Sequence, residues 1–190
     1  MLKQIITETT DAVVAAVQGV DDILDAITEA VKDQVVNVLK DVGEIGGGTV
    51  EAVASVASGA IKGAGQVGAS VTDTAANTMS GIIKGTSQVS GDVLGAIRGG
   101  AKGIVEGVAD AGGDVGGAAV SAVQGAIKAV GDTGGNTADA AKEAVGGALD
   151  AAGDVGGDAA GKVRTALLEA AALPHDVIES AIKGHEDKKK

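Results

Sequence analysis

The 190-residue chain contains no phenylalanine, tyrosine, tryptophan or cysteine, and only one proline. Aromatic rings supply much of the bulk of ordinary cores and ligand pockets, so a deep pocket for a stacked cofactor is hard to build from this sequence. The absence of cysteine excludes disulfides, thiolate zinc sites, iron–sulfur clusters and cysteine nucleophiles, and it leaves the redox compartment open. The apolar residues are mostly alanine and valine. Such small side chains predict a thin, closely spaced core.

Positive charge is also scarce: the chain has 15 lysine and arginine residues but 26 acidic residues, so its net charge is −11. This balance disfavours nucleic-acid binding through phosphates. It also disfavours attraction to an anionic membrane, except at the final Lys188-Lys189-Lys190. The N-terminal stretch MLKQIITETTDAVV lacks the uncharged apolar core of a secretion signal, so we expect a cytoplasmic protein. The longest uncharged run, from Val115 to Ile127, is too short to be a transmembrane helix.

Glycine, by contrast, occurs 32 times and follows a tandem repeat. Blocks of 22 residues that start at Gly59 align without a gap from 59 to 168, and a degenerate copy precedes them at 37–58. Every block begins with glycine, has a large aliphatic residue third, and has serine, aspartate or asparagine twelfth. The third residues are Ile61, Ile83, Val105, Ile127 and Leu149, and the twelfth residues are Ser70, Asp92, Asp114, Asn136 and Asp158.

The repeat decides how the segment GAGQVG, residues 63–68, is interpreted. The segment fits the G-x-G-x-x-G pattern of dinucleotide-binding loops. The matching segments of the other blocks, GTSQVS, GVADAG, AVGDTG and AAGDVG, break that pattern. A dinucleotide loop also needs a preceding strand, whereas the preceding VEAVASVASGAIK favours a helix. We therefore interpret GAGQVG as one variant of a repeat and expect no cofactor.

The period predicts an all-α fold. A 22-residue block is two elevens, which correspond to 3.67 residues per helical turn. The aliphatic residues of a block fall on one stripe of such a helix, as in an amphipathic helix. The pair Gly-Gly followed by a capping residue indicates that one helix stops and the next begins. The predicted helices are 49–67, 71–89, 93–111, 115–133, 137–155 and 159–172; the alternative is one long continuous helix kinked at the glycine pairs.

A second face of each predicted helix carries glycine and alanine, for example Gly81, Gly85 and Ala96. Glycine costs about 1 kcal/mol in a helix relative to alanine, so a free helix of this composition should not persist in water. A face without side chains, however, lets another backbone come close. We therefore expect stacked or laterally assembled helices that use one aliphatic face and one flat face.

The two ends of the chain differ from the repeat region at 46–168. Residues 1–45 predict an acidic, heptad-like helix with a coiled-coil-like seam. Residues 169–190 predict a short last helix and a charged tail: Pro174 breaks the preceding helix, Gly184 ends the last one, and HEDKKK is solvated. The seam residues are Val13, Val17, Val20, Leu24, Ile27, Val31, Val35, Val38 and Val42.

The sequence contains no set of residues whose types and spacing are typical of a catalytic or metal-binding site. The only histidines, His175 and His185, are too far apart to form a helical metal pair, and we interpret both as exposed. Asp110 and Asp114 could hold a cation only weakly, and Asp114 is better explained as an N-cap. Neither an EF-hand loop nor a G-x-S-x-G nucleophile elbow occurs. We expect no catalytic, cofactor-binding or metal-binding residue, and therefore no enzyme.

Tandem amphipathic repeats of eleven and 22 residues resemble those of exchangeable apolipoproteins, of desiccation-protective late-embryogenesis-abundant proteins and of granule-coating phasins. The resemblance covers residues 37–168 and is one of period, with Gly-Gly-Asp in place of the proline of apolipoprotein repeats. The leading hypothesis is a non-enzymatic structural repeat protein that self-assembles into a homo-oligomer. One alternative is an amphipathic coat on a lipid or hydrophobic granule surface. Another is a desiccation or stress protectant.

Overall fold

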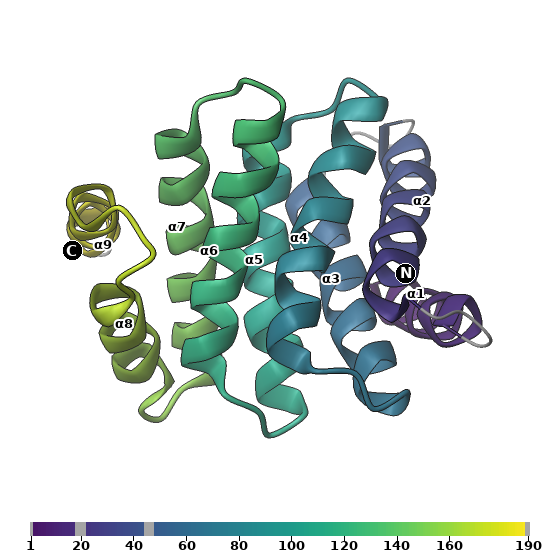
Figure 1. Ribbon diagram of the computed structural model, residues 1–190, viewed down its shortest axis with the longest axis horizontal. Helices are drawn as coiled ribbons and strands as arrows, with labels where there is room; N and C mark the ends of the chain where they lie inside the picture. Colours follow the sequence, from purple (N-terminus) through teal and green to yellow (C-terminus); the bar gives the residue numbers. More distant parts are fainter. Residues whose placement is uncertain (1, 18–21, 44–47, 189–190) are drawn as a thin grey trace.

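A computed structural model describes residues 2–17, 22–43 and 48–188 of the chain. Within these residues the chain forms nine α-helices and no strand, so the predicted all-α class is confirmed. Figure 1 shows the helices following one another in chain order from the purple N-terminal end to the yellow C-terminal end. The helices are α1 Leu2–Val17, α2 Ile23–Gly43, α3 Thr49–Gln66, α4 Val71–Gln88, α5 Val93–Asp110, α6 Val115–Asp132, α7 Thr137–Val155, α8 Ala159–Glu169 and α9 His175–Lys188.

The helices are arranged in two layers. The first layer contains α1, α3, α5, α7 and α9 side by side, and the second contains α2, α4, α6 and α8. Each helix also packs against the helices before and after it in the chain, which lie in the other layer. Contacts between near neighbours only are typical of repeat architectures. The alternative of one long kinked helix is wrong, because the chain leaves one layer and enters the other at the end of every helix.

Local capping signals set the ends of the central helices. The residue before α4, α5, α6 and α7 accepts a hydrogen bond from a backbone N–H of the first helical turn; these residues are Ser70, Asp92, Asp114 and Asn136. Gly112 and Gly134, in the preceding turns, have φ values of 69° and 74°, a backbone conformation that glycine adopts without strain. Asp158 makes no such bond with its side chain. Helix α8 ends at Glu169 rather than at 172, since a turn precedes Pro174.

The prediction of a single helix over residues 1–45 is wrong. The described residues form α1 in the first layer and α2 in the second, and the Asp22 carboxylate accepts the N–H of Asp25 at 3.2 Å, which caps the start of α2. Two shorter helices can each bury one face within the stack, whereas a single continuous helix over residues 1–45 could not do so along its whole length. The seam residue Val20 lies outside the described residues, as does the side chain of Val42. The other seam residues lie on α1 and α2, and they include the fully buried Val13, Val31 and Val35.

Aliphatic side chains fill the space between the layers. Ile61, Ile83 and Val105, at the third position of their blocks, are at most 1 % exposed. Alanine supplies much of the remaining buried surface, for example Ala57, Ala101 and Ala122. Small core residues of this kind let the helices lie close together, because the distance between helix axes depends on the side chains at the contact.

Glycines bring backbones together within a layer. On α5, three glycines one turn apart face three residues of α3: Gly99, Gly103 and Gly107 lie against Val50, Ala54 and Ser58. The residue numbers rise together along both helices, so α5 runs parallel to α3. A methyl group on Gly103 would overlap the carbonyl oxygen of Ala54. Only glycine fits this approach without moving a backbone.

The GAGQVG segment lies at the C-terminal end of α3 and in the turn that follows. Gly63 packs against Val13 of α1, whereas a side chain on Gly65 or Gly68 would meet nothing within 4 Å. The C-terminus of a helix presents carbonyl oxygens, whereas a pyrophosphate needs the N–H groups of an N-terminus. The segment therefore serves as a helix end and an interhelix contact.

Candidate binding groove and a polar network between helices

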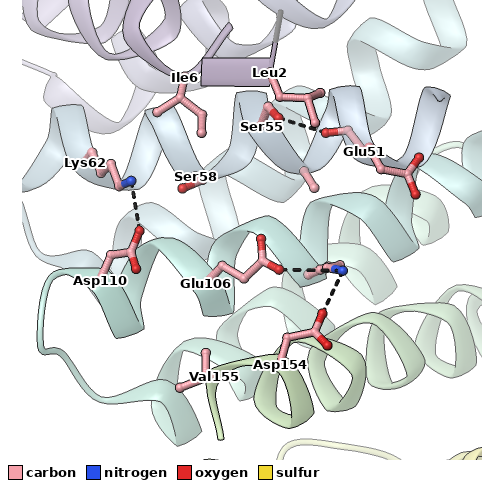
Figure 2. A pocket seen from close by; sticks show the side chains of 12 residues that line it. Leu2, Ile6, Glu51, Ser55, Ser58, Lys62, Glu106, Asp110, Asp154 and Val155 are labelled. Carbon is pink, nitrogen blue, oxygen red and sulfur yellow. Dashed lines mark hydrogen bonds and ion pairs between the residues drawn. The ribbon is translucent and has the colours of Figure 1, made fainter. Parts of the chain in front are cut away.

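A groove of about 480 Å³ opens on the first layer, between side chains of α1, α3, α5 and α7 (Figure 2). Its apolar and small lining residues come from three helices: Leu2 and Ile6 from α1, Ala54, Ser55 and Ser58 from α3, and Val155 from α7. Leu2 and Val155 are 46 % and 42 % exposed, which is high for large aliphatic residues in this structure. The groove therefore presents apolar surface that no part of the described chain covers.

Charged side chains surround this apolar surface. They are Glu51, Lys62, Lys102, Glu106, Asp110 and Asp154. The Nζ atom of Lys62 lies 2.9 Å from Asp110, which links α3 to α5, and the Nζ atom of Lys102 lies 2.9 Å from Asp154, which links α5 to α7. Because four carboxylates face two ammonium groups that are already engaged, the rim carries surplus negative charge.

Burial and pairing with neighbouring charges shift the pKa values around Lys102. Burial raises the pKa of Glu106 above its ordinary value; the charge of Lys102 opposes the rise, and the neighbouring charges of Asp154 and Asp110 add to it. The hydrogen bond to Asp154 is the largest cause of the raised pKa of Lys102. A cation that entered the groove would therefore meet carboxylates that repel one another.

Ser58 is the polar group of the groove floor that lacks a partner. The residue is only 5 % exposed, and its hydroxyl makes no hydrogen bond to any described residue. The neighbouring Ser55 differs, because its hydroxyl donates to the carbonyl oxygen of Glu51 at 2.9 Å. The Ser58 hydroxyl is not among the fully buried hydroxyls without a partner, which are those of Thr9, Thr74, Thr78 and Thr86, so it is open to the groove and can bond a ligand or water there.

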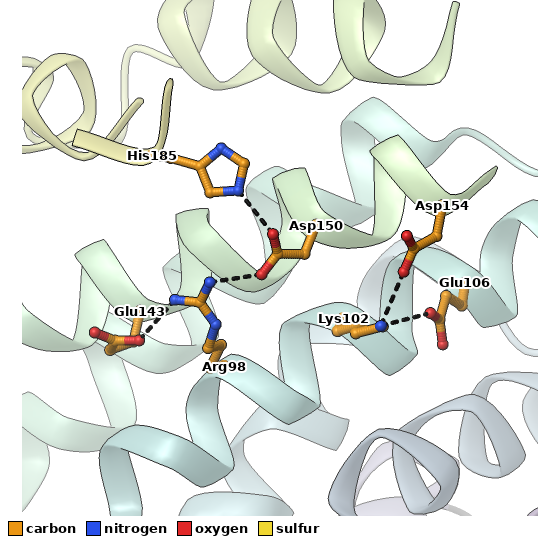
Figure 3. A network of polar contacts seen from close by, with 7 residues as sticks. All are labelled: Arg98, Lys102, Glu106, Glu143, Asp150, Asp154 and His185. Carbon is orange, nitrogen blue, oxygen red and sulfur yellow. Dashed lines mark hydrogen bonds and ion pairs between the residues drawn. The ribbon is translucent and has the colours of Figure 1, made fainter. Parts of the chain in front are cut away.

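A second polar cluster connects α5, α7 and α9 (Figure 3). The Arg98 guanidinium binds Glu143 at 3.2 Å and Asp150 at 2.6 Å, and the Nε2 atom of His185 lies 2.8 Å from the other oxygen of Asp150. Burial alone would raise the pKa of Asp150. The hydrogen bond with His185 and the charge and hydrogen bond of Arg98 outweigh it and lower that pKa.

The cluster corrects two predictions about the C-terminus. His185, predicted to be exposed, keeps only 11 % of its side-chain surface exposed, whereas His175 is exposed as predicted. Gly184, predicted to end the last helix, lies inside α9, which continues to Lys188. The bond from His185 to α7 and the ion pair between Glu186 and Arg164 of α8 hold this extra turn in place. Lys189 and Lys190 of the predicted tail lie outside the described residues.

The chemistry of these clusters is that of ion pairs. Both oxygens of Asp150 are engaged, by Arg98 and by His185, so the carboxylate links three helices. Among the described residues, no group of histidine, aspartate and glutamate is placed to hold a metal ion. In the same part of the chain, no helix combines the length and apolar character needed to cross a bilayer.

Comparison with protein families and with curated protein sequences gives no match. The packing and the groove are therefore the features of the chain that bear on its function.

Proposed function

We propose that this chain is a non-enzymatic structural repeat protein whose helices pack closely through glycine and alanine faces. One observation carries the proposal: the first glycine of each block faces a backbone carbonyl oxygen of the helix two positions earlier. The glycines are Gly59, Gly81, Gly103, Gly125 and Gly147, and they face the carbonyl oxygens of Ile6, Thr28, Ala54, Ala76 and Arg98. One block position thus makes the same kind of contact in both layers, as expected if the 22-residue period encodes the stack.

These contacts explain why so many helical glycines are tolerated. A methyl group on Gly59 or Gly81 would lie 2.6 Å from a carbonyl oxygen, closer than a carbon atom can approach without displacing it. Each glycine lowers the helix propensity of the segment that contains it. In return it allows a parallel neighbour to come near enough for continuous van der Waals contact.

The geometry favours close packing within one chain over packing between copies. The glycine faces of α3 to α7 are already covered by helices of the same chain. At the N-terminal end, α1 and α2 turn polar residues such as Glu8, Asp11, Asp25 and Glu29 to solvent. A polar outer face offers no apolar surface on which a further repeat or a second copy could stack. These contacts support a monomer over the predicted homo-oligomer.

No specific observation favours the lipid-coat alternative. A coat would need the aliphatic stripe to face lipid, but Ile61, Ile83 and Val105 are buried between the layers. Exposing them would cost about 2 kcal/mol for each side chain. The stress-protectant alternative requires a chain that is disordered when dilute, which a packed two-layer stack opposes.

Mass and amide protection test the proposal together. Light scattering after gel filtration, at low and at high concentration, should give the monomer mass of 18.1 kDa. Hydrogen exchange in dilute buffer should show protected amides throughout α3 to α7. A mass that rises with concentration would support self-assembly instead, and uniformly weak protection would support the protectant.

A further inference from the structure

We propose that the groove on the first layer binds a basic amphipathic peptide segment of a partner protein. An aliphatic side chain of the segment lies on the floor of Ala54, Ser55 and Ser58, and its lysine or arginine side chains reach the carboxylate rim. This inference rests on the proposed function, because it assigns a partner class to the groove of the packed stack.

The floor suits an aliphatic side chain with a polar backbone beside it. Its α3 residues are small, so the groove is hollowed where larger side chains would fill it. Leu2 and Val155 flank it and leave nearly half of their surface exposed, which a bound side chain would cover. The hydroxyl of Ser58 lines the groove and can bond a backbone N–H or carbonyl group of the segment.

The rim selects positive charge. Lys62 and Lys102 are neutralised by Asp110, Glu106 and Asp154. Glu51 is exposed at the edge of the groove and forms no ion pair with any described residue. Burial is the main cause of the raised pKa of Glu106, and the charges of Asp154 and Asp110 add to it. A lysine or arginine of a partner would offset this repulsion in a partly desolvated site.

Other occupants fit less well. A second copy of the chain carries a net charge of −11 and is repelled at long range. An anionic lipid surface is repelled in the same way, and a groove sunk between helices does not match a flat bilayer. A peptide is narrow enough to enter the groove and supplies both an aliphatic group and a cation.

Three labelled peptides of about 14 residues test the inference by fluorescence anisotropy. The first carries leucine and lysine at helical spacing, the second has serine in place of leucine, and the third has glutamate in place of lysine. We expect the first to bind at least about tenfold more tightly than either of the others. Equal binding of the serine peptide would overturn the role of the floor. Equal binding of the glutamate peptide would overturn the role of the rim.

Two charge reversals locate the site. Glu51→Lys changes the groove, and Glu179→Lys changes the exposed surface of α9 by the same charge. We expect Glu51→Lys to weaken binding of the leucine–lysine peptide at least about fivefold and Glu179→Lys less than about twofold. Equal weakening would mean that only the overall charge matters and would overturn the inference.

The failure of this inference differs from the failure of the proposed function. A monomer with protected amides that binds none of the peptides overturns the groove assignment and leaves the packed stack intact. A chain without protected amides overturns the stack itself. Circular dichroism and thermal melting of both variants show whether lost binding reflects lost folding.

Discussion

The central helices and the C-terminal helices of this molecule are held together by different means. In α3 to α7, glycines such as Gly103 and Gly147 place one helix against the backbone of another. In α8 and α9, buried aliphatic residues such as Leu167 and Ile178 make the contacts, supplemented by the bond from His185 to Asp150. A side chain on Gly184 of α9 would meet nothing within 4 Å.

The glycine content of a helix alone therefore does not indicate how closely that helix packs against its neighbours. The same residue type is a close contact in α5 and α7 and an ordinary solvent-facing position in α9. A substitution at a glycine should therefore have opposite effects at a close contact such as Gly147 and at an open position such as Gly184. Substitutions of large aliphatic residues should matter most where glycine contacts are missing.

The largest expected effect is that of Gly147→Val. Its side chain would overlap the carbonyl oxygen of Arg98 and force α7 away from α5. We expect the free energy of unfolding to fall by about 3 kcal/mol or more, as for overpacking that must move a backbone. Urea unfolding followed by circular dichroism measures it. A loss below about 1 kcal/mol would show that the two helices are not in close contact.

Ile178→Ala tests the C-terminal region. Ile178 is fully buried on α9, so its truncation removes apolar contact and leaves a cavity, at a cost of about 2–4 kcal/mol. Because α9 contacts only α7 and α8 among the described helices, we expect amide protection to fall first in α8 and α9. Hydrogen exchange resolved by helix checks this, and an equal loss of protection in α3 would contradict it.

The substitution Asp150→Asn tests the contribution of the polar contacts of Asp150 separately from that of the aliphatic contacts of α9. The pKa of Asp150 is lowered in the folded chain, so its contribution to stability is present above its ordinary value of 3.8 and is lost as the pH falls through the folded pKa. We expect the substitution to cost about 1–2 kcal/mol at pH 7 and progressively less below pH 3.8. Urea unfolding at pH 7 and at pH 3 gives both values. The same cost at both would exclude an ionic origin.

Gly184→Ala should stabilise the chain slightly. Its added methyl group would meet no neighbour, and alanine is the better helix former by about 0.5–1 kcal/mol. A small rise in the melting temperature is the expected result. A fall would mean that α9 packs against another surface at this position.

The smallest expected effect is that of Glu106→Gln in the groove. The pKa of Glu106 is raised in the folded chain, so its favourable contribution exists below its ordinary value of 4.5 and is lost as the pH rises through the folded pKa. At pH 7 the substitution should therefore raise the free energy of unfolding by a few tenths of a kcal/mol, discounted for solvent screening. Paired melts at pH 7 and pH 4 test this, and a gain at both values would contradict it.

The helices of the repeat were predictable because their ends depend on local chemistry. Asp92, Asp114 and Asn136 cap helices that begin one residue later, and a glycine pair precedes each of the last two. The split between α1 and α2 was missed, although Asp22 supplies a cap, because the aliphatic spacing continues across it.

The site was not predictable, because its parts are far apart in sequence. His185 and Asp150 are 35 residues apart and meet only when α9 packs on α7. The groove needs residues of four helices, and every block carries a similar flat face, so the sequence does not say which helix faces which. Leu2 and Val155, far apart in the sequence, share one groove only because the first layer brings α1 and α7 to it.

The most direct test of close backbone approach compares two glycine-to-alanine substitutions by urea unfolding. Gly65 lies in α3, where an added methyl group would meet nothing within 4 Å, and Gly103 lies in α5 against Ala54. The account predicts that Gly65→Ala raises the free energy of unfolding by up to about 1 kcal/mol. It predicts that Gly103→Ala lowers this free energy by at least about 2 kcal/mol. A similar small stabilisation by both substitutions would contradict it.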